Sequence, residues 1–252
     1  MSELRGQIAL VTGSSRGIGA AIAKRFAAAG ALVALHGRDE QALADVAGAI
    51  REAGGRAIVT TGDVTDFAAM EGIRTQVERE VGPIDVLVAN AGGSFTAPAA
   101  LEDIPEDGWR ASIEGNLTAT FLTLKSVVPG MKARRRGAII TISSAAARRP
   151  HPRSPMPYAA AKAGLGLMTQ ALAMQIGPFG IRANCIAPET ILTEHNLARI
   201  PDDQQIAVAE QHPLPRLGNP ADVAEAALYL ASARAAWITG IVLDVAGGAV
   251  MV

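Results

Sequence analysis

The sequence predicts an α/β fold in which a doubly wound, parallel sheet of seven strands carries helices on both faces. Three observations support this fold class. Short apolar segments alternate with segments of helical pattern, the apolar segments are continuous, and a glycine-rich turn joins the first of them to a helix. Strands that are apolar throughout are typical of a parallel sheet buried on both faces. The chain has 252 residues, of which 49% are hydrophobic, so we expect residues 1–252 to form a single domain.

The expected strands are short runs rich in Val, Ile, Leu and Ala, each bounded by turn residues or by a helical segment. The run Ala138-Ile139-Ile140 illustrates the pattern, because it leaves no polar face for solvent. In chain order the strands cover residues 7–12, 31–36, 56–61, 84–89, 137–142, 181–186 and 241–245.

The expected helices follow the strands, and glycine or proline marks several of their ends. The second helix stops at Gly54-Gly55 and the third at Gly82-Pro83. In chain order the helical segments cover residues 20–29, 40–53, 67–81, 109–135, 155–176 and 220–231. Strand–helix–strand units of this kind form right-handed crossovers, which build a doubly wound sheet.

Two irregular segments interrupt the alternation, at residues 145–157 and 189–219. Each follows an expected strand. Because ligands bind at the carboxyl ends of the strands in such sheets, we expect both segments to shape a substrate pocket.

A phosphate site is predicted between the first strand and the first helix. Residues 12–19 read Thr-Gly-Ser-Ser-Arg-Gly-Ile-Gly. Glycines let the backbone turn tightly and approach a pyrophosphate, whose charge meets the free N–H groups at the start of a helix. The alternative is a glycine-rich connection without a ligand, and the flanking strand and helix make it the weaker explanation.

Tyr158 and Lys162 are four residues apart in an expected helix, so they share one helix face. A phenol ordinarily titrates near pH ~10, and a neighbouring ammonium group favours the phenolate and lowers its pKa. Tyr158 would then serve as a general acid and base. The pair alone is a weak signal, because the same spacing also occurs between surface neighbours.

Together these motifs resemble the short-chain dehydrogenase/reductase family, in its compact single-domain form with a Rossmann fold, over residues 7–248. The glycine spacing is that family's Thr-Gly-x-x-x-Gly-x-Gly, and Asn90-Ala91-Gly92 follows the fourth expected strand as the family's structural Asn-Ala-Gly does. Four residues stand in the family's catalytic order, namely Asn116, Ser144, Tyr158 and Lys162.

The resemblance implies a role for each of these four. Tyr158 would exchange a proton with the substrate oxygen while hydride passes to or from a nicotinamide, and Lys162 would lower the tyrosine pKa and bind the nicotinamide ribose. Ser144 would polarise the substrate carbonyl or hydroxyl, although Ser143 competes for this role. Asn116 would hold a water that links Lys162 to solvent, unless it is an ordinary helix residue. Hydroxyl donors placed in advance stabilise the alkoxide that develops during hydride transfer.

The resemblance also implies the contacts of an NAD(P) cofactor. Asp63 and Val64 would contact the adenine, with a helix N-cap as the competing role of Asp63. The expected cofactor-binding residues are Gly13, Ser15, Arg16, Gly17, Ile18, Gly19, Arg38, Asp63, Val64, Asn90, Ala91, Gly92, Tyr158, Lys162, Pro188, Ile191 and Thr193.

NADP is the expected form of the cofactor. An acid at the end of the second strand usually binds the ribose hydroxyls of NAD, whereas an arginine there accommodates a 2′-phosphate. Gly37 stands where the acid is expected, and Arg38 follows it. Arg16 is a second cation that could hold the phosphate, and Asp39 is better explained as the N-cap of the next helix. NAD remains the alternative if both arginines are only solvated surface charges.

Glu189 departs from the family pattern, in which Pro188 is followed by a glycine. Glutamate adopts positive φ less readily than glycine, so the backbone beside the nicotinamide is expected to differ. Thr193 should still reach the carboxamide.

Segment 145–157 holds several cations and no acid, and it is one residue longer than in many relatives. They are Arg148, Arg149, His151 and Arg153. Two explanations are open, an anionic group on the substrate or a basic solvated loop.

The first functional hypothesis is an NADP(H)-dependent oxidoreductase that interconverts a ketone and a secondary alcohol. Within it, the chain is similar to 3-oxoacyl-[acyl-carrier-protein] reductases, in which a basic patch docks the carrier. Arg134-Arg135-Arg136 supports this weakly, because cations also suit a helix end. A non-catalytic NAD(P)-sensing regulator is the hypothesis from another class, but such proteins tend to lose the tyrosine or the lysine.

Composition argues against several other classes. A formal net charge of −1 predicts no nucleic-acid partner. The polar start and the absence of a run of ~20 apolar residues predict no signal peptide, no membrane span and a cytoplasmic location. Cys185 is expected to be a buried structural thiol, and no cluster has metal-ligand spacing. We expect a small carbonyl or alcohol substrate and a homotetramer or homodimer, as in the family.

Overall fold

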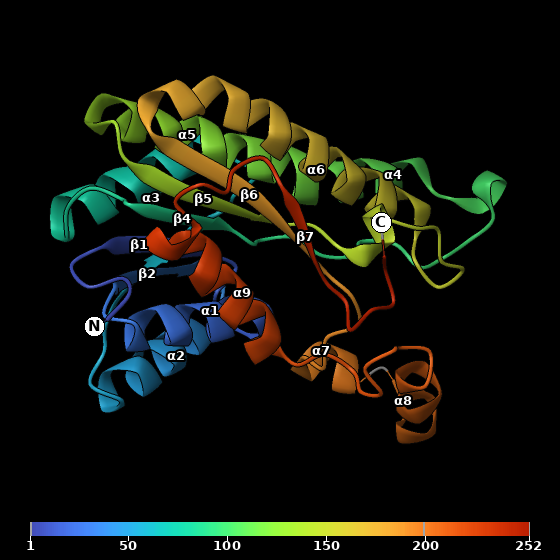
Figure 1. Cartoon of the computed structure of the whole chain (residues 1–252). Helices are drawn as coiled ribbons and strands as arrows, with labels where there is room; N and C mark the ends of the chain where they lie inside the picture. Colours follow the sequence, from blue (N-terminus) through green and yellow to red (C-terminus); the bar gives the residue numbers. More distant parts are fainter. Residues whose placement is uncertain (1, 199, 252) are drawn as a thin grey trace.

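The protein forms a parallel sheet of seven strands, as expected, in the order β3-β2-β1-β4-β5-β6-β7 (Figure 1). This computed structural model describes residues 2–198 and 200–251. The strands are β1 (Ile8–Thr12), β2 (Leu32–Gly37), β3 (Arg56–Thr61), β4 (Val86–Ala89), β5 (Gly137–Ile142), β6 (Ile181–Pro188) and β7 (Val242–Val245). The order reverses between β1 and β4, and such a switch point is where doubly wound sheets bind ligands.

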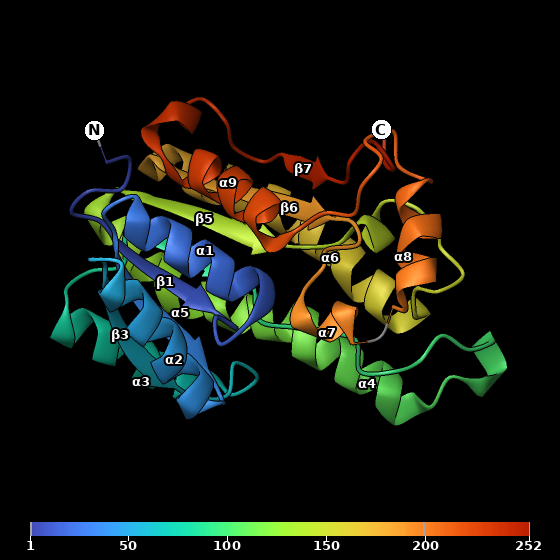
Figure 2. The ribbon, with the colours of Figure 1, turned by 90° about the horizontal axis from the view of Figure 1, so that it is seen from below.

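Helices cover both faces of the sheet (Figures 1 and 2). One face carries α1 (Gly17–Ala28), α2 (Glu40–Glu52) and α9 (Pro220–Ala231). The other carries α3 (Phe67–Glu80), α5 (Ala119–Arg134) and α6 (Met156–Ile176). Alternate residues of one strand serve the two cores, since Ala9 and Val11 pack on the first face and Leu10 on the second. The continuous apolar strands of the sequence therefore have the expected cause.

Helix starts follow from short polar side chains. Asp39 accepts a hydrogen bond from the backbone N–H of Ala42 and caps α2, as predicted. Asp63 does not cap α3, because Asp66 does so, and that alternative for Asp63 is wrong. Asp63 instead accepts bonds from the backbone N–H and the hydroxyl of Thr65.

The expected helical segment 109–135 has three parts. They are α4 (Glu106–Ile113), a π-helical turn (Glu114–Thr118) and α5. The π turn contains Asn116, and such turns occur often at functional sites because they redirect a side chain.

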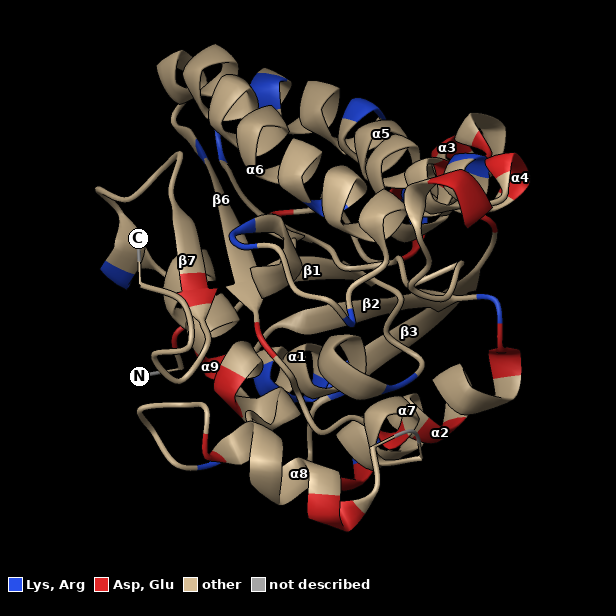
Figure 3. Ribbon diagram, turned by 90° about the vertical axis from the view of Figure 1, so that its right-hand side faces the viewer, with Lys and Arg blue, Asp and Glu red and all other residues tan. Residues whose placement is uncertain are grey.

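Segment 189–219 is more regular than expected. It contains two short helices, α7 (Glu194–Leu197) and α8 (Asp202–Ala209), and Ile191 forms a parallel bridge with Gly218. Segment 145–157 holds one 3-10 turn (Ala145–Ala147) before α6 begins. Both segments lie at the carboxyl ends of the strands. Figure 3 views the molecule from that side.

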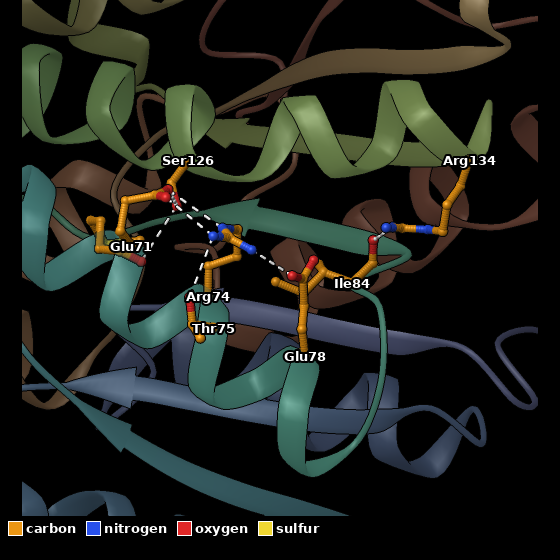
Figure 4. A network of polar contacts seen from close by, with 8 residues as sticks. Glu71, Arg74, Thr75, Glu78, Ile84, Ser126 and Arg134 are labelled. Atoms are coloured by element: carbon orange, nitrogen blue, oxygen red, sulfur yellow. Dashed lines mark hydrogen bonds and ion pairs between the residues drawn. The ribbon is translucent and has the colours of Figure 1, made fainter.

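A polar network ties α3 to α5 (Figure 4). Arg74 lies 3.1 Å from Glu71 and 2.5 Å from Glu78, and the Ser126 hydroxyl of α5 donates a 2.6 Å hydrogen bond to Glu71. Arg134 donates to the carbonyl of Ile84 ahead of β4 at 2.6 Å. These contacts hold the second helix layer in register with the sheet.

Within residues 2–198 and 200–251, we find no helix whose length and apolar character would suffice to cross a membrane.

Candidate active site

The glycine turn between β1 and α1 is packed against the end of β4. Gly13 and Gly17 have φ values of +65° and +56°, which L-residues with side chains rarely adopt. A Cβ added to Gly13 would lie 2.9 Å from the Cα of Ala91, and one added to Gly19 would lie 2.2 Å from the Gly13 carbonyl oxygen. Close backbone approach therefore requires glycine here.

The start of α1 has the properties of an anion site. No side chain caps its first turn, and no acidic residue lies in that turn. Helix α1 begins at Gly17, three residues earlier than expected, so Ile18 and Gly19 belong to the helix and Ser15 precedes it. Backbone N–H groups without capping partners and the helix dipole suit the pyrophosphate of a dinucleotide.

The segment after β4 is held by buried amide groups. Asn90 donates from its side chain to the carbonyls of Thr12 and Gly13, each at 3.0 Å. Asn116 is fully buried, accepts from the N–H of Gly93 at 3.1 Å and donates to its carbonyl at 2.9 Å. We call residues 12–19 and 90–93 the site floor.

Ser144, Tyr158 and Lys162 come together beside β5 and α6. The Ser144 hydroxyl interacts with the Tyr158 phenol, and the Lys162 Nζ lies 5.7 Å from the centre of the Tyr158 ring. Lys162 is 4% exposed and donates a 2.8 Å hydrogen bond to the carbonyl of Ile142. Ser143 donates to the Lys162 carbonyl at 2.7 Å, so it points away from the phenol.

Burial governs the protonation of this group. It raises the pKa of Tyr158 above its usual value, and the contact with Ser144 only partly offsets this. The expected lowering of this pKa by Lys162 is not found, because burial dominates and the ammonium group donates to the Ile142 carbonyl. Burial also lowers the pKa of Lys162 to about 8.

The residues predicted around the adenosine lie at the ends of β2 and β3. Arg16 and Arg38 are exposed, and Arg16 forms a 2.8 Å ion pair with Asp39. The pKa of Asp63 is lowered, chiefly by its hydrogen bonds with Thr65 and to a smaller extent by the charge of Arg38. Both arginines thus have acidic neighbours that compete with a phosphate.

The segment after β6 reaches back to the glycine turn. Thr193 caps α7, and its methyl carbon lies 3.2 Å from the position that a Cβ on Gly17 would take. Pro188 ends β6, and Ile191 is buried against Gly218. We call residues 189–218 the site roof.

The cations of segment 145–157 do not act as one group. Arg148 forms a 3.0 Å ion pair with Asp244 of β7. It is therefore not free to bind an anionic group on the substrate, which was one of the two explanations for this segment. Arg149 and Arg153 are exposed, and within residues 2–198 and 200–251 no ion pair involves them. His151 accepts a hydrogen bond from the N–H of Arg153.

Several residues that support the site were not predicted from the sequence. Thr12 accepts from the N–H groups of Asn90 and Ala91, each at 3.1 Å, and a threonine before the first glycine was the available signal. The Ile142 carbonyl that orients Lys162 gives no signal, because any residue supplies a carbonyl. Cys185 is fully buried, as predicted.

This fold and this group of side chains define an oxidoreductase that binds NAD(P). A family model described as enoyl-(acyl carrier protein) reductase matches residues 13–250. The chain is 40% identical to the 3-oxoacyl-[acyl-carrier-protein] reductase FabG of Escherichia coli, over 99% of this chain and 100% of that protein. It therefore belongs to the short-chain dehydrogenase/reductase family and acts on CH–OH groups or the corresponding ketones with NAD(P).

Solved structures agree with this assignment. A 3-oxoacyl-[acyl-carrier protein] reductase from Brucella melitensis with bound NAD is 33% identical with a TM-score of 0.91, covering 100% of this chain and 94% of that chain. A gluconate 5-dehydrogenase from Burkholderia cenocepacia in complex with NADP and tartrate is 34% identical with a TM-score of 0.91, covering 98% and 96%. The similar proteins thus differ in substrate and in cofactor.

Proposed function

We propose that this chain is an NADP(H)-dependent reductase of ketones to secondary alcohols, in which Tyr158 is the proton donor. The grouping of Ser144, Tyr158 and Lys162 carries the proposal, because it places two hydroxyl donors side by side, next to a buried ammonium group, where a carbonyl oxygen could accept from both. Ser144 lies close enough to share that oxygen as a second hydroxyl donor.

The bound nicotinamide would supply the hydride at the carbonyl carbon. The residues of this chain supply the binding, the charge and the positioning. The site floor would hold the pyrophosphate at the start of α1, Lys162 carries a buried positive charge beside the phenol, and Asn116 fixes the backbone at Gly93. A water between Lys162 and solvent remains part of the proposal for Asn116.

Replacing Tyr158 with Phe tests the acid. We expect kcat/KM with NADPH and a ketone to fall by about 10³-fold, while the melting temperature changes little, because only a hydroxyl is lost. A Ser143→Ala variant is the matched control, since that hydroxyl bonds to a backbone carbonyl instead of the phenol. Full activity of the phenylalanine variant on a true substrate would contradict the proposal.

The preference for NADP depends on Arg38, with Arg16 as a second phosphate contact. Exposed ion pairs contribute about 0–1 kcal/mol, so a phosphate dianion can displace Asp39 from Arg16. In an Arg38→Asp variant we expect the ratio of kcat/KM for NADPH to that for NADH to fall by at least about tenfold. An unchanged ratio would show that Arg38 does not bind the 2′-phosphate.

A 3-oxoacyl thioester is the second candidate substrate, supported by the similarity to FabG. The arginines at the end of α5 are partly engaged within the chain, because Arg134 bonds to Ile84, Arg135 to Pro178 and Arg136 to Asp85. A carrier protein would have to bind the exposed parts of Arg135 and Arg136. Comparing a 3-oxoacyl group on carrier protein with the same group on a small thiol tests this, since equal kcat/KM values would argue against carrier docking.

Assembly into a homotetramer or homodimer also stays a proposal. A shallow apolar groove on α5 and α6, lined by Leu117, Phe121, Leu167 and Met168, is exposed to solvent in one chain. Light scattering of the purified protein would measure the assembly directly.

A further inference from the structure

Glu189 and His212 form a buried pair in the site roof. The Glu189 Oε2 lies 3.2 Å from the His212 Nε2, and the two side chains are 19% and 4% exposed. Glu189 directly follows β6, whereas His212 lies after α8. The pair therefore ties the two ends of the roof together.

The hydrogen bonds of His212 determine its protonation. Its Nδ1 lies 2.8 Å from the Val208 carbonyl oxygen, and its Nε2 faces the Glu189 carboxylate. A carbonyl and a carboxylate only accept hydrogen bonds, so both ring nitrogens must carry hydrogen. The geometry thus requires an imidazolium ring.

Glu189 is suited to face that charge. Burial would raise the pKa of its carboxyl, but the hydrogen bonds from Thr190 and His212 outweigh this effect and lower the pKa overall. The ionised carboxylate accepts from the N–H of Thr190 and from the His212 ring.

The other charged groups nearby are paired among themselves. They surround a cavity of about 360 Å³ beside the pair. Arg216 bonds to Asp222 at 2.7 Å, and Asp244 bonds to Arg148 at 3.0 Å. Glu189 and His212 are therefore each other's polar partner at this cavity.

The pair is connected to the cofactor side of the roof through the backbone. Glu189 donates its N–H to the Val245 carbonyl at 3.1 Å, and the Thr190 carbonyl accepts from Gly218 at 3.1 Å. Thr193, four residues after Glu189, lies beside the glycine turn, because its methyl carbon is 3.2 Å from the position that a Cβ on Gly17 would take. A shift at Glu189 would move the residues that lie against the pyrophosphate site.

We propose that Glu189 is a positioning residue, and that its pairing with His212 holds residues 190–193 over the cofactor. Cofactor binding is then tighter with the pair intact than after Glu189 is replaced. This inference rests on the proposed placement of the cofactor.

Nuclear magnetic resonance of the full chain tests the protonation without any cofactor. The ¹⁵N shifts of the imidazole nitrogens distinguish an imidazolium from either neutral tautomer, and a His212→Gln spectrum assigns the signal. We expect both ring nitrogens of His212 to carry hydrogen, because both face acceptors. A ring without hydrogen on Nε2 overturns the proposal.

Binding of NADPH, followed by fluorescence titration at one pH below the pKa of Lys162, which is about 8, tests the consequence. Glu189→Gln should bind NADPH about fivefold more weakly than the wild type, because the pair with His212 is weakened. Glu210→Gln, which removes an exposed carboxylate two residues from His212, should follow the wild type.

The outcomes separate the two proposals. Equal NADPH affinities for the wild type and Glu189→Gln overturn the positioning role of Glu189, even if NADPH binds well. If the wild type binds NADH but not NADPH, the proposed cofactor preference fails, and the same titration with NADH still tests the role of Glu189.

Discussion

The site floor and the site roof are built in different ways. The floor is backbone packed on backbone, with glycines that leave no space for a Cβ and with the Asn90 amide bridging two carbonyls. The roof is held by side-chain pairs and one isolated bridge, and it exposes large apolar residues such as Leu197, Ile206 and Leu214. The comparison shows that the floor depends on rigid short-range geometry, whereas the roof depends on contacts that a few substitutions can change.

The largest effect should come from the floor. In Gly19→Ala, the new Cβ would meet the Gly13 carbonyl at 2.2 Å, so the turn must move. We expect NADPH affinity to fall by at least about a hundredfold and the melting temperature to fall by several degrees. Gly48→Ala is the matched control, because nothing lies within 4 Å of its added Cβ and alanine favours a helix. Equal behaviour of the two variants would remove the distinction between floor and roof.

A medium effect is expected at Lys162, beside the floor. Burial lowers its pKa from 10.5 to about 8, so between these values the unfolded chain binds more protons than the folded one. This lysine therefore adds stability as the pH rises from about 8 to 10, by about 2 kcal/mol. Denaturant unfolding at both pH values should show the increase relative to Lys162→Met, and a constant difference between the two proteins would show that Lys162 does not titrate in this range.

The smallest effect should come from the substrate loop next to the roof. Arg148→Ala breaks a partly exposed ion pair with Asp244, which is expected to cost less than about 1 kcal/mol. The ratio of kcat/KM for a charged substrate to that for its neutral analogue should stay the same, because Arg148 already has a partner. A drop in that ratio of tenfold or more would restore Arg148 as a substrate contact.

Most of the floor could be predicted from the sequence. Glycine spacing, the Asn-Ala-Gly segment and the Tyr158–Lys162 spacing are local patterns, and each depends on residues close together in the chain. Strand order also follows, because right-handed crossovers leave few arrangements for alternating strands and helices.

The roof could not be predicted in the same way. Segment 189–219 shows no long periodic pattern, so α7 and α8 were missed. Glu189 was seen as a departure from the family, but nothing near it in the sequence indicates that His212 is its partner. The same limitation applies to Arg148, whose partner lies 96 residues away.

The order of residues alone thus predicted the fold class and the family correctly and indicated the candidate reacting side chains, because steric and periodic constraints act over a few neighbours. Protonation and pairing were decided by the folded chain. Tyr158 and Lys162 have shifted pKa values because of their burial, and desolvation depends on everything that packs around a group, including residues far away along the chain.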